Sequence, residues 1–235
     1  MNYFDRVVQE YSRKREDKVN EQILDANPEK STAIQNLIEV TYKKGNEVWL
    51  MTDWHFIKYN KDTGASFVRP ETKTILSNAK SMIKPDDLLI FLGDICDGEI
   101  EDKPAIAHYI SEIPGTKILV RGNNDLFPDS WYLDHGFKYV TPKFIWDNII
   151  FTHRPQDNDN RINVHGHIHG SKKYYNSEIS HYHNQIDVAW LGGREKPVKL
   201  LTAIGKQPAY ASVITFVDKP WKNDTPIKDR DKNKK

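Results

Sequence analysis

The sequence contains a single cysteine, Cys96, among its 235 residues. A lone thiol cannot form an intramolecular disulfide bond, which excludes small disulfide-stabilised secreted proteins and makes the cytoplasm the expected location. No stretch reaches the roughly 18 consecutive apolar residues that a membrane-spanning helix needs. Residues 1–6 also lack the apolar core of a signal peptide. The sequence therefore predicts a protein that has no membrane partner.

A strong net charge of either sign is also missing. The chain has 34 Lys and Arg residues against 33 Asp and Glu residues, which gives a formal net charge of +1. This balance provides no overall electrostatic attraction to nucleic acid. The basic and aromatic residues 172–175 and the Lys-rich C-terminal tail could still form a local basic track. A small-molecule substrate is favoured, and nucleic acid stays open as a partner.

Five short apolar runs, in contrast, are each followed by side chains that bind metal ions. The runs are residues 48–51, 88–92, 117–120, 149–152 and 162–164. The side chains that follow them are, in the same order, Asp53 with His55, then Asp94, Asn123 and His153, and finally His167 with His169. Short β-branched and aliphatic runs bounded by Gly, Asp and Asn predict buried strands. Since the strands of one sheet bring their carboxyl ends to a common rim, we expect these polar residues to converge. Carboxylate, imidazole and carboxamide groups suit divalent transition metals.

The alternation of strand-like and helix-like segments predicts a layered α/β domain. One helix is expected at about residues 70–83 and another at about residues 104–113. Residues 147–148, Asp-Asn between two apolar runs, predict a hairpin turn.

Three regions are expected along the chain. They are a helical N-terminal extension at residues 1–45, the α/β domain at residues 46–217 and a charged, disordered tail at residues 218–235. The extension carries an apolar stripe at helical spacing, Phe4, Val7, Val8 and Tyr11. Pro28 is expected to end this helix, and a second helix is expected from Ser31 or Thr32. The stripe packs either on the domain or on a second copy of the chain, so a homo-oligomer stays open.

In their order and spacing, the polar segments resemble the signature of the calcineurin-like metallophosphoesterase superfamily. They are Asp53-Trp54-His55, Gly93-Asp94-Ile95-Cys96-Asp97, Gly122-Asn123-Asn124-Asp125, His153 and Gly166-His167-Ile168-His169. Each segment alone occurs by chance in many chains, whereas five in order, each after a predicted strand, form a specific pattern. The pattern covers about residues 46–204. The resemblance implies a two-sheet β-sandwich flanked by helices, and an enzyme that hydrolyses phosphoric esters.

The resemblance also implies a centre with two divalent transition-metal ions. Asp94 would bridge the ions, with Asp53, His55 and His169 as the further ligands of one ion and Asn123, His153 and His167 as those of the other. A metal-bridging hydroxide would be the nucleophile, because water bound to such cations loses its proton near neutral pH. Manganese is the expected metal, although iron, nickel, cobalt and zinc suit the same nitrogen and oxygen ligands.

One position departs from the family pattern. Where the family has His after Gly-Asn, this sequence has Asn124. A carboxamide donates a hydrogen bond but does not transfer a proton near neutral pH. Some family members lack this His and act mainly on phosphodiesters, so the resemblance implies a phosphodiester or nucleotide-like substrate. We expect Asn124 to contact the substrate and, with Asp94 and Asp97, to contribute to catalysis.

Other residues beside the motifs have two interpretations each. Asp97 and Asp125 either hydrogen-bond the metal ligands or cap turns. Arg121 and Arg154 either clamp a phosphate group, which is the role we predict, or are surface charges at strand ends. Trp54 either stacks on a nucleotide base or packs in the core.

Two other functions stay open on the sequence alone. A nuclease would use the same metal centre on DNA or RNA and would need a local basic track. A non-catalytic scaffold with this fold would have no need of intact ligands, and the presence of all seven residues at the ligand positions disfavours it.

Overall fold

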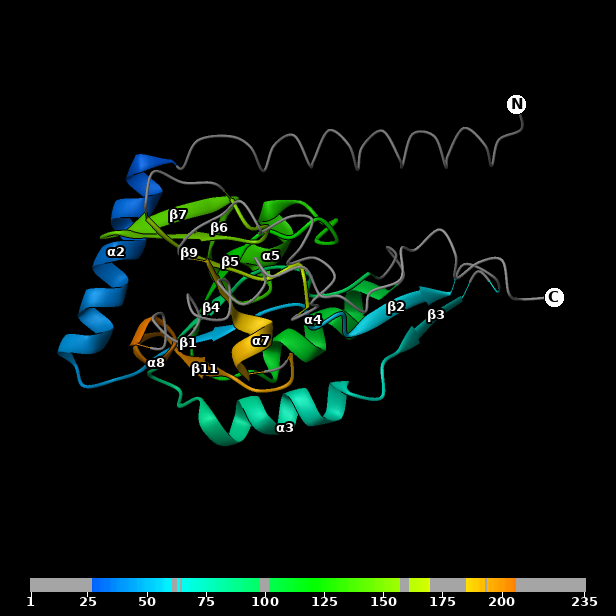
Figure 1. Ribbon diagram of the computed structural model, residues 1–235. Coiled ribbons are helices and arrows are strands. Elements are labelled where there is room, and N and C mark those ends of the chain that lie inside the picture. The colour runs from blue at the N-terminus through cyan, green and yellow to red at the C-terminus, as the bar shows by residue number, and fades with distance from the viewer. Residues whose placement is uncertain are drawn as a thin grey trace, which may run out of the picture.

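The computed structural model describes residues 27–60, 63, 65–97, 102–156, 161–169, 185–192 and 194–205. These residues form a mixed α/β fold with a five-stranded, a four-stranded and a two-stranded sheet (Figure 1). The α/β class predicted from the sequence is confirmed. None of the helices among the described residues is long and apolar enough to cross a membrane. The N-terminal apolar stripe, residues 172–175 and the tail at 218–235 lie outside the described residues.

The five-stranded sheet is mainly parallel and has the order β11-β1-β4-β5-β6. Its strands are β1 (Val48–Met51), β4 (Leu88–Phe91), β5 (Thr116–Val120), β6 (Phe137–Thr141) and β11 (Val198–Lys199). Only β11 is antiparallel, to β1. Every residue of β1 and β4 is buried, as expected for a parallel sheet covered on both faces.

The four-stranded sheet has the order β10-β9-β8-β7. Its strands are β7 (Lys143–Trp146), β8 (Ile149–Thr152), β9 (Ile162–His165) and β10 (Gln185–Asp187). β7 and β8 form the hairpin predicted at residues 147–148, and Asp147 adopts a φ of 52° there, a conformation that tight hairpin turns require and Asp tolerates. The small sheet is a second hairpin, β2 (Ile57–Asn60) with β3 (Ala65–Val68).

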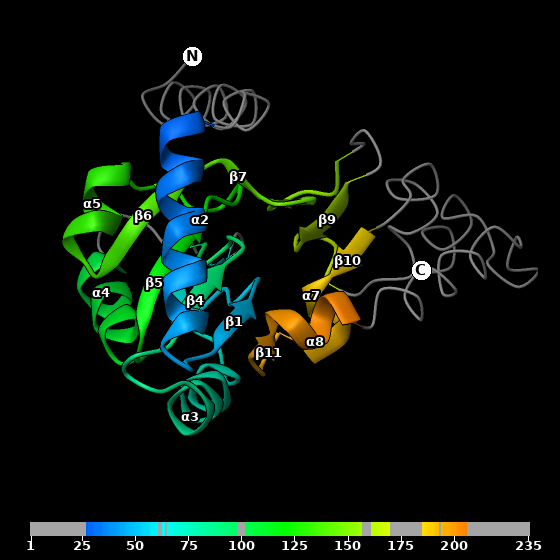
Figure 2. The same ribbon diagram turned by 90° about the vertical axis from the view of Figure 1, so that its left-hand side faces the viewer.

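Three helices cover one face of the five-stranded sheet. They are α3 (Thr72–Met82), α4 (Lys103–Ser111) and α5 (Asp129–Asp134) (Figure 2). They share a hydrophobic core with Trp49, Leu89 and Leu119 of the central strands. The helices α3 and α4 agree with the predicted helices to within two residues at each end. Trp54 is buried in this core, so its role is packing rather than stacking on a base.

The opposite face of the five-stranded sheet shares a core with the second sheet. Leu50, Ile90 and Ile118 of the first sheet belong to the same hydrophobic cluster as Phe151 and Val164 of the second. Successive residues of a strand point to opposite faces, which is why Leu50 enters this cluster and its neighbours in β1 enter the other. Helices α7 (Val188–Gly192) and α8 (Leu200–Gly205) contribute to the same cluster. This shared core holds the two sheets in a fixed relation.

Helix α2 (Pro28–Lys43) packs on this second core. Asn27 caps the helix by accepting a hydrogen bond from the Lys30 backbone N–H at 2.9 Å. The helix begins at Pro28, not at Ser31 or Thr32, because proline lacks an N–H that the first helical turn does not need. The Lys30 ammonium donates to the Val140 carbonyl at 2.7 Å, which ties the helix to β6.

Two residues of α2 provide a test of how tightly the helix is integrated. Ile38 is fully buried in the second core, whereas Val40 is 44% exposed on the same helix. We expect Ile38→Ala to lower the free energy of unfolding by about 2–5 kcal/mol, because it removes apolar contacts and leaves a cavity. The control Val40→Ala should change it by less than about 0.5 kcal/mol. Urea denaturation measures both, and equal effects would show that α2 does not pack as described.

Candidate metal centre

The predicted site residues meet where the carboxyl ends of strands from two sheets come together. β1, β4 and β5 of the five-stranded sheet lead into Asp53, Asp94 and Asn123, while β8 and β9 of the four-stranded sheet lead into His153 and His167. The convergence predicted from the sequence is therefore present. It arises from the junction of two sheets, however, and not from the rim of a single sheet.

The side chains form two groups that share one carboxylate. Asp53, His55, Asp94 and His169 form the first group, and Asp94, His153 and His167 form the second. Within each group one donor atom per residue lies within 4.8 Å of all the others. The Asn123 Oδ1 atom lies 3.1 Å from His153 Nε2, which places this carboxamide beside the second group. All seven residues predicted as ligands are thus assembled in one place.

The imidazole rings of His55 and His153 turn their Nε2 atoms toward the interior of the site. His55 Nδ1 lies 2.7 Å from the Asp97 carboxylate and His153 Nδ1 lies 2.7 Å from the Leu92 carbonyl. Both oxygen atoms only accept hydrogen bonds, so each Nδ1 carries a proton and each Nε2 is the atom left to bind a metal ion. His55 Nε2 and His169 Nε2 face each other at 3.2 Å. Two lone pairs at this distance repel unless a cation or a proton lies beside them, so the donor set fits a metal ion.

The electrostatics of the site also favour a cation. Burial lowers the pKa of His153, but the charges of Asp94 and Asp53 outweigh burial and raise it to about 9. Burial raises the pKa of Asp94, but the positive His153 beside it holds this pKa below its usual range. Two buried carboxylates therefore keep a compensating positive charge next to them, here the proton of His153. A divalent ion provides the same compensation more fully.

The backbone is unusual at these positions. Five predicted ligands have a positive φ between 45° and 70°, namely Asp53, His55, Asp94, His167 and His169. Among the described residues other than glycine, only Asp147 in the hairpin turn shares this property. Left-handed conformations are uncommon for such residues and cluster at functional sites. The concentration of strained backbone in one place supports a functional role for the group.

The glycines of the motifs allow the strand ends to approach one another. A Cβ atom on Gly122 would overlap the Asp94 carboxylate, and one on Gly166 would overlap the Thr52 hydroxyl. A Cβ atom on Gly93 would overlap the backbone of Gly122. These contacts explain why glycine stands beside a candidate ligand in three of the five segments.

The two acidic residues beside the motifs have different roles. Asp97 hydrogen-bonds His55 and so orients a candidate ligand. Asp125 accepts hydrogen bonds from the backbone N–H groups of Asp94, Ile95 and Gly122 and so fixes two of the loops. Burial and the nearby Asp94 charge raise the pKa of Asp125 to about 6.

The two arginines predicted to clamp a phosphate group also have different surroundings. Arg121 donates to the Asp129 carboxylate at 2.6 Å, to the Phe127 carbonyl at 2.9 Å and to the Asp125 carbonyl. These bonds hold Arg121 against its own loop and favour a positioning role for it over the predicted contact with a phosphate group. Arg154 Nη2 instead lies 3.4 Å from Asn123 Oδ1, beside the second group.

Three residues of the region were not predicted from the sequence. The buried Thr52 hydroxyl donates to the Asp53 carboxylate at 2.9 Å. Arg69 and Arg194 line a cavity that His169 also lines. Thr52 directly precedes a motif and could have been noticed, whereas the arginines lie outside all five segments and only the folded chain brings them near His169.

The fold and the site define an α/β protein with a His and Asp cluster suited to divalent metal ions. The family model described as calcineurin-like phosphoesterase matches residues 47–228 of the chain, and the protein belongs to that family. Membership indicates a metal-dependent phosphoester hydrolase, and the family resemblance noted in the sequence is confirmed.

Individual relatives are distant. An uncharacterized protein from Methanocaldococcus jannaschii is 26% identical over 164 residues, which cover 66% of this chain and 87% of the relative. A crystal structure of an Aquifex aeolicus protein of unknown function has a TM-score of 0.47 and 23% identity, and covers 68% of this chain and 98% of that chain. The Pseudomonas putida nuclease MPE has a TM-score of 0.39 and 17% identity, over 53% of this chain and 62% of that chain.

The close approach of the loops gives a test of the site. We expect Gly122→Ala to weaken the binding of divalent metal by about 10–100-fold, because the added methyl group displaces the Asp94 carboxylate. Gly205→Ala is the control, since a Cβ atom there meets nothing within 4 Å. Equilibrium dialysis with manganese measures the binding, and unchanged affinity in Gly122→Ala would contradict the described contact.

Proposed function

We propose that this protein hydrolyses phosphodiesters or nucleotide-like substrates with two divalent transition-metal ions. The observation that carries the proposal is the position of Asp94, whose carboxylate belongs to both groups of candidate ligands. A carboxylate can offer one oxygen atom to each of two cations, or one oxygen atom to both. Asp53, His55 and His169 would complete the ligands of one ion, and Asn123, His153 and His167 those of the other.

When bound, the two ions would supply Lewis acidity that polarises the phosphoryl group and lowers the pKa of a water molecule at the site. The protein's own residues hold the ligands in place. Asp97 fixes the ring of His55, and the Leu92 carbonyl fixes the ring of His153. The hydrogen bond of Thr52 and the His167 backbone N–H to Asp53 fix that carboxylate. These contacts set the geometry before substrate binds, which reduces the reorganisation that catalysis requires.

The preference for diesters rests on Asn124. Its backbone N–H donates to Asp94 Oδ1 at 2.9 Å and its side-chain amide donates to Asp94 Oδ2 at 2.8 Å. The residue therefore lies at the shared carboxylate, where the family's usual His would lie. A carboxamide can donate a hydrogen bond to a phosphate oxygen but cannot protonate a leaving group near neutral pH. A diester with a good leaving group needs this proton least.

Arg154 is the residue proposed to contact the phosphate group. Its Nη2 atom lies near Asn123, and its Nε atom is buried with no hydrogen-bond partner among the described residues. A guanidinium group with donor capacity left can bind phosphate oxygens directly. The role of Arg121, in contrast, is to hold the loop that carries Asn123 and Asn124.

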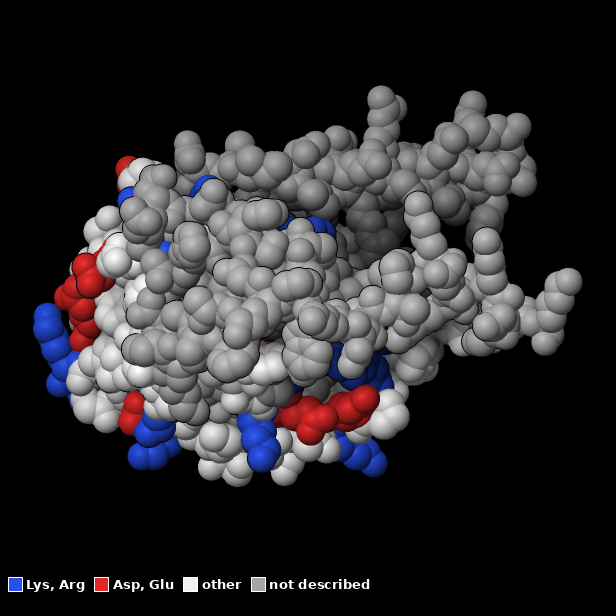
Figure 3. Space-filling model, viewed as in Figure 1, with Lys and Arg blue, Asp and Glu red and all other residues white. Residues whose placement is uncertain are grey.

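Metal identity, location and assembly stay predictions from the sequence, with manganese as the first metal to test, the cytoplasm as the expected location and a homo-oligomer open. Cleavage of DNA or RNA is the alternative activity. On the face shown in Figure 3, the described Lys and Arg residues are interspersed with Asp and Glu, and no broad basic track is visible among the described residues. The near-zero net charge of the sequence favours a small substrate over a nucleic-acid strand.

The shared carboxylate provides the direct test of the proposal. We expect Asp94→Asn to reduce the hydrolysis of bis(p-nitrophenyl) phosphate by about 100-fold or more, because an amide cannot supply the shared negative charge. Chelation of the metal should abolish activity, and added manganese should restore it in the unmodified protein and in the control but not in Asp94→Asn. Asp86→Asn, which changes an exposed carboxylate, is the matched control. Full activity in a metal-free preparation would exclude the proposed mechanism.

The position of Asn124 provides a second test. We expect the unmodified protein to hydrolyse bis(p-nitrophenyl) phosphate faster than p-nitrophenyl phosphate. Asn124→His should raise the monoester-to-diester ratio of kcat/KM by about 100-fold, because it adds a proton donor beside Asp94. Asn124→Ala removes the same hydrogen bond without adding a donor and should leave the ratio low. If Asn124→His leaves the ratio unchanged, Asn124 does not determine the preference.

A further inference from the structure

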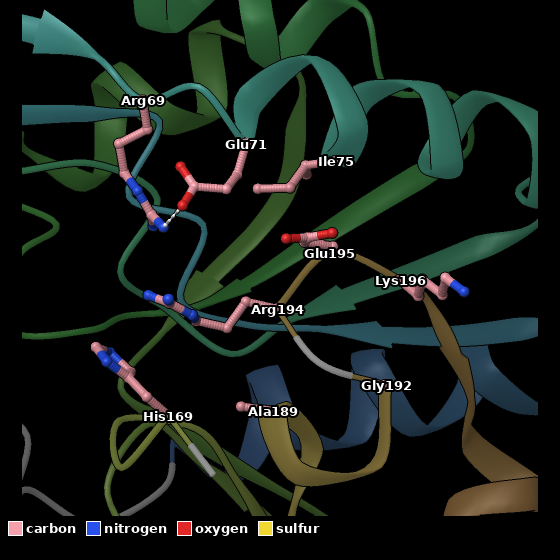
Figure 4. Close-up of a pocket in the computed structure, with 9 residues that line it drawn as sticks. All are labelled: Arg69, Glu71, Ile75, His169, Ala189, Gly192, Arg194, Glu195 and Lys196. Atoms are coloured by element: carbon pink, nitrogen blue, oxygen red, sulfur yellow. Dashed lines mark ion pairs between the residues drawn. The ribbon is translucent and has the colours of Figure 1, made fainter. Parts of the chain in front are cut away.

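A cavity of about 370 Å³ opens beside the candidate metal centre. His169, a predicted metal ligand, lines one part of it, and Arg69, Glu71 and Arg194 line the adjoining wall (Figure 4). The His169 side chain is 35% exposed, whereas the Asp53 carboxylate beside it is fully buried. The cavity is therefore a route by which a substrate can reach this part of the centre, and its volume suits a small organic ligand.

The two arginines of the cavity have different surroundings. Arg69 is largely buried and is held by the Trp54 carbonyl at 3.1 Å and by an ion pair with Glu71 at 3.1 Å. Arg194 forms no ion pair with any acidic side chain of the described residues. Its guanidinium group extends toward Arg69 and His169, while Lys196 points away from them (Figure 4).

This arrangement places like charges close together. Burial and the nearby charge of Arg69 lower the pKa of Arg194, and the carboxylates of Asp53, Glu71 and Glu195 offset this lowering only in part. A divalent ion held by His169 would add further positive charge at the same wall. An anion between Arg194 and the metal centre would relieve this repulsion, and guanidinium groups bind phosphate oxygens in a bidentate manner.

We propose that the cavity binds a second phosphate group of the substrate, with Arg194 as its principal contact. The preferred substrate is then a phosphodiester that carries a phosphomonoester group on the same nucleotide-sized unit. The diester phosphate lies at the metal centre and the second phosphate lies in the cavity. Ala189, which lies beside His169 in the cavity wall (Figure 4), provides apolar surface for the sugar between the two phosphates. This inference rests on the proposed function and specifies its substrate class.

Matched chromogenic esters test the inference. One pair is thymidine 5′-(p-nitrophenyl phosphate) with and without a 3′-phosphate, and the other is thymidine 3′-(p-nitrophenyl phosphate) with and without a 5′-phosphate. For at least one pair we expect the phosphorylated ester to have a kcat/KM about tenfold higher in the manganese-loaded protein, the gain of a charge-assisted hydrogen-bonded contact. Arg194→Gln should reduce this ratio to about one. Because the ratio compares two esters on one preparation, loss of folded protein or of metal cancels.

The control variant is Lys43→Gln, which removes one positive charge from an exposed ion pair on α2 and should keep the ratio. A ratio near one in the unmodified protein for both pairs would overturn the inference, as would a ratio that Arg194→Gln leaves unchanged. Hydrolysis of bis(p-nitrophenyl) phosphate, which has no second phosphate, separates a failure of the second-phosphate inference from a failure of the proposed function. If the metal-loaded protein cleaves neither this diester nor any of the thymidine esters, the proposed function itself fails, and the inference fails with it.

Discussion

The burial of two carboxylates against the imidazole rings of His55, His153 and His169 is the constraint on which the rest of the site depends. Asp53 and Asp94 are almost completely buried, and an uncompensated buried carboxylate is strongly unfavourable. His153 compensates both with a proton when no metal is present, which is why its pKa is raised to about 9. The ring nitrogen atoms that would bind metal already face inward, because Asp97 and the Leu92 carbonyl hold the opposite nitrogen of His55 and His153. The cluster is thus arranged around positive charge.

Bringing these groups together requires an unusual backbone. The ligands come from loops at the ends of strands in two different sheets, and a common hydrophobic core fixes these sheets relative to each other. The loops approach so closely that Gly93 and Gly122 leave no space for a side chain. Five candidate ligands adopt left-handed backbone conformations in the same small volume. Such strain persists only where the surrounding structure determines it, and here the cores on both faces of the parallel sheet do so.

The candidate metal centre has a buried side and an exposed side. His153 is buried at the inner side of the centre, and His169 is exposed to the cavity that holds Arg194. The reacting phosphate group would therefore lie between two parts of the site. The candidate metal ligands and Arg154 would be on its buried side, and the cavity lined by Arg69 and Arg194 would be on its exposed side. In the proposed function, chemistry and substrate recognition would be separated. The strand ends would carry the chemistry, and the cavity side chains would recognise the substrate, namely Arg194, which follows α7, and Arg69 and Glu71, which lie between β3 and α3.

The sequence by itself determined the α/β class, the strands before each motif, the helices α3 and α4 and the identity of the residues that converge. These features are local, since apolar runs, turn residues and helical periodicity act over a few positions. The specific order of the motifs indicates that their residues belong to one site. Tertiary structure alone decided which strand belongs to which sheet and that α2 begins at Pro28 and is part of the core. It also decided that Arg121 supports a loop while Arg154 faces the site. It alone placed Arg69 and Arg194 beside His169. Each of these outcomes depends on contacts between residues far apart in the chain, and no periodicity or spacing in the sequence encodes which guanidinium group finds which partner.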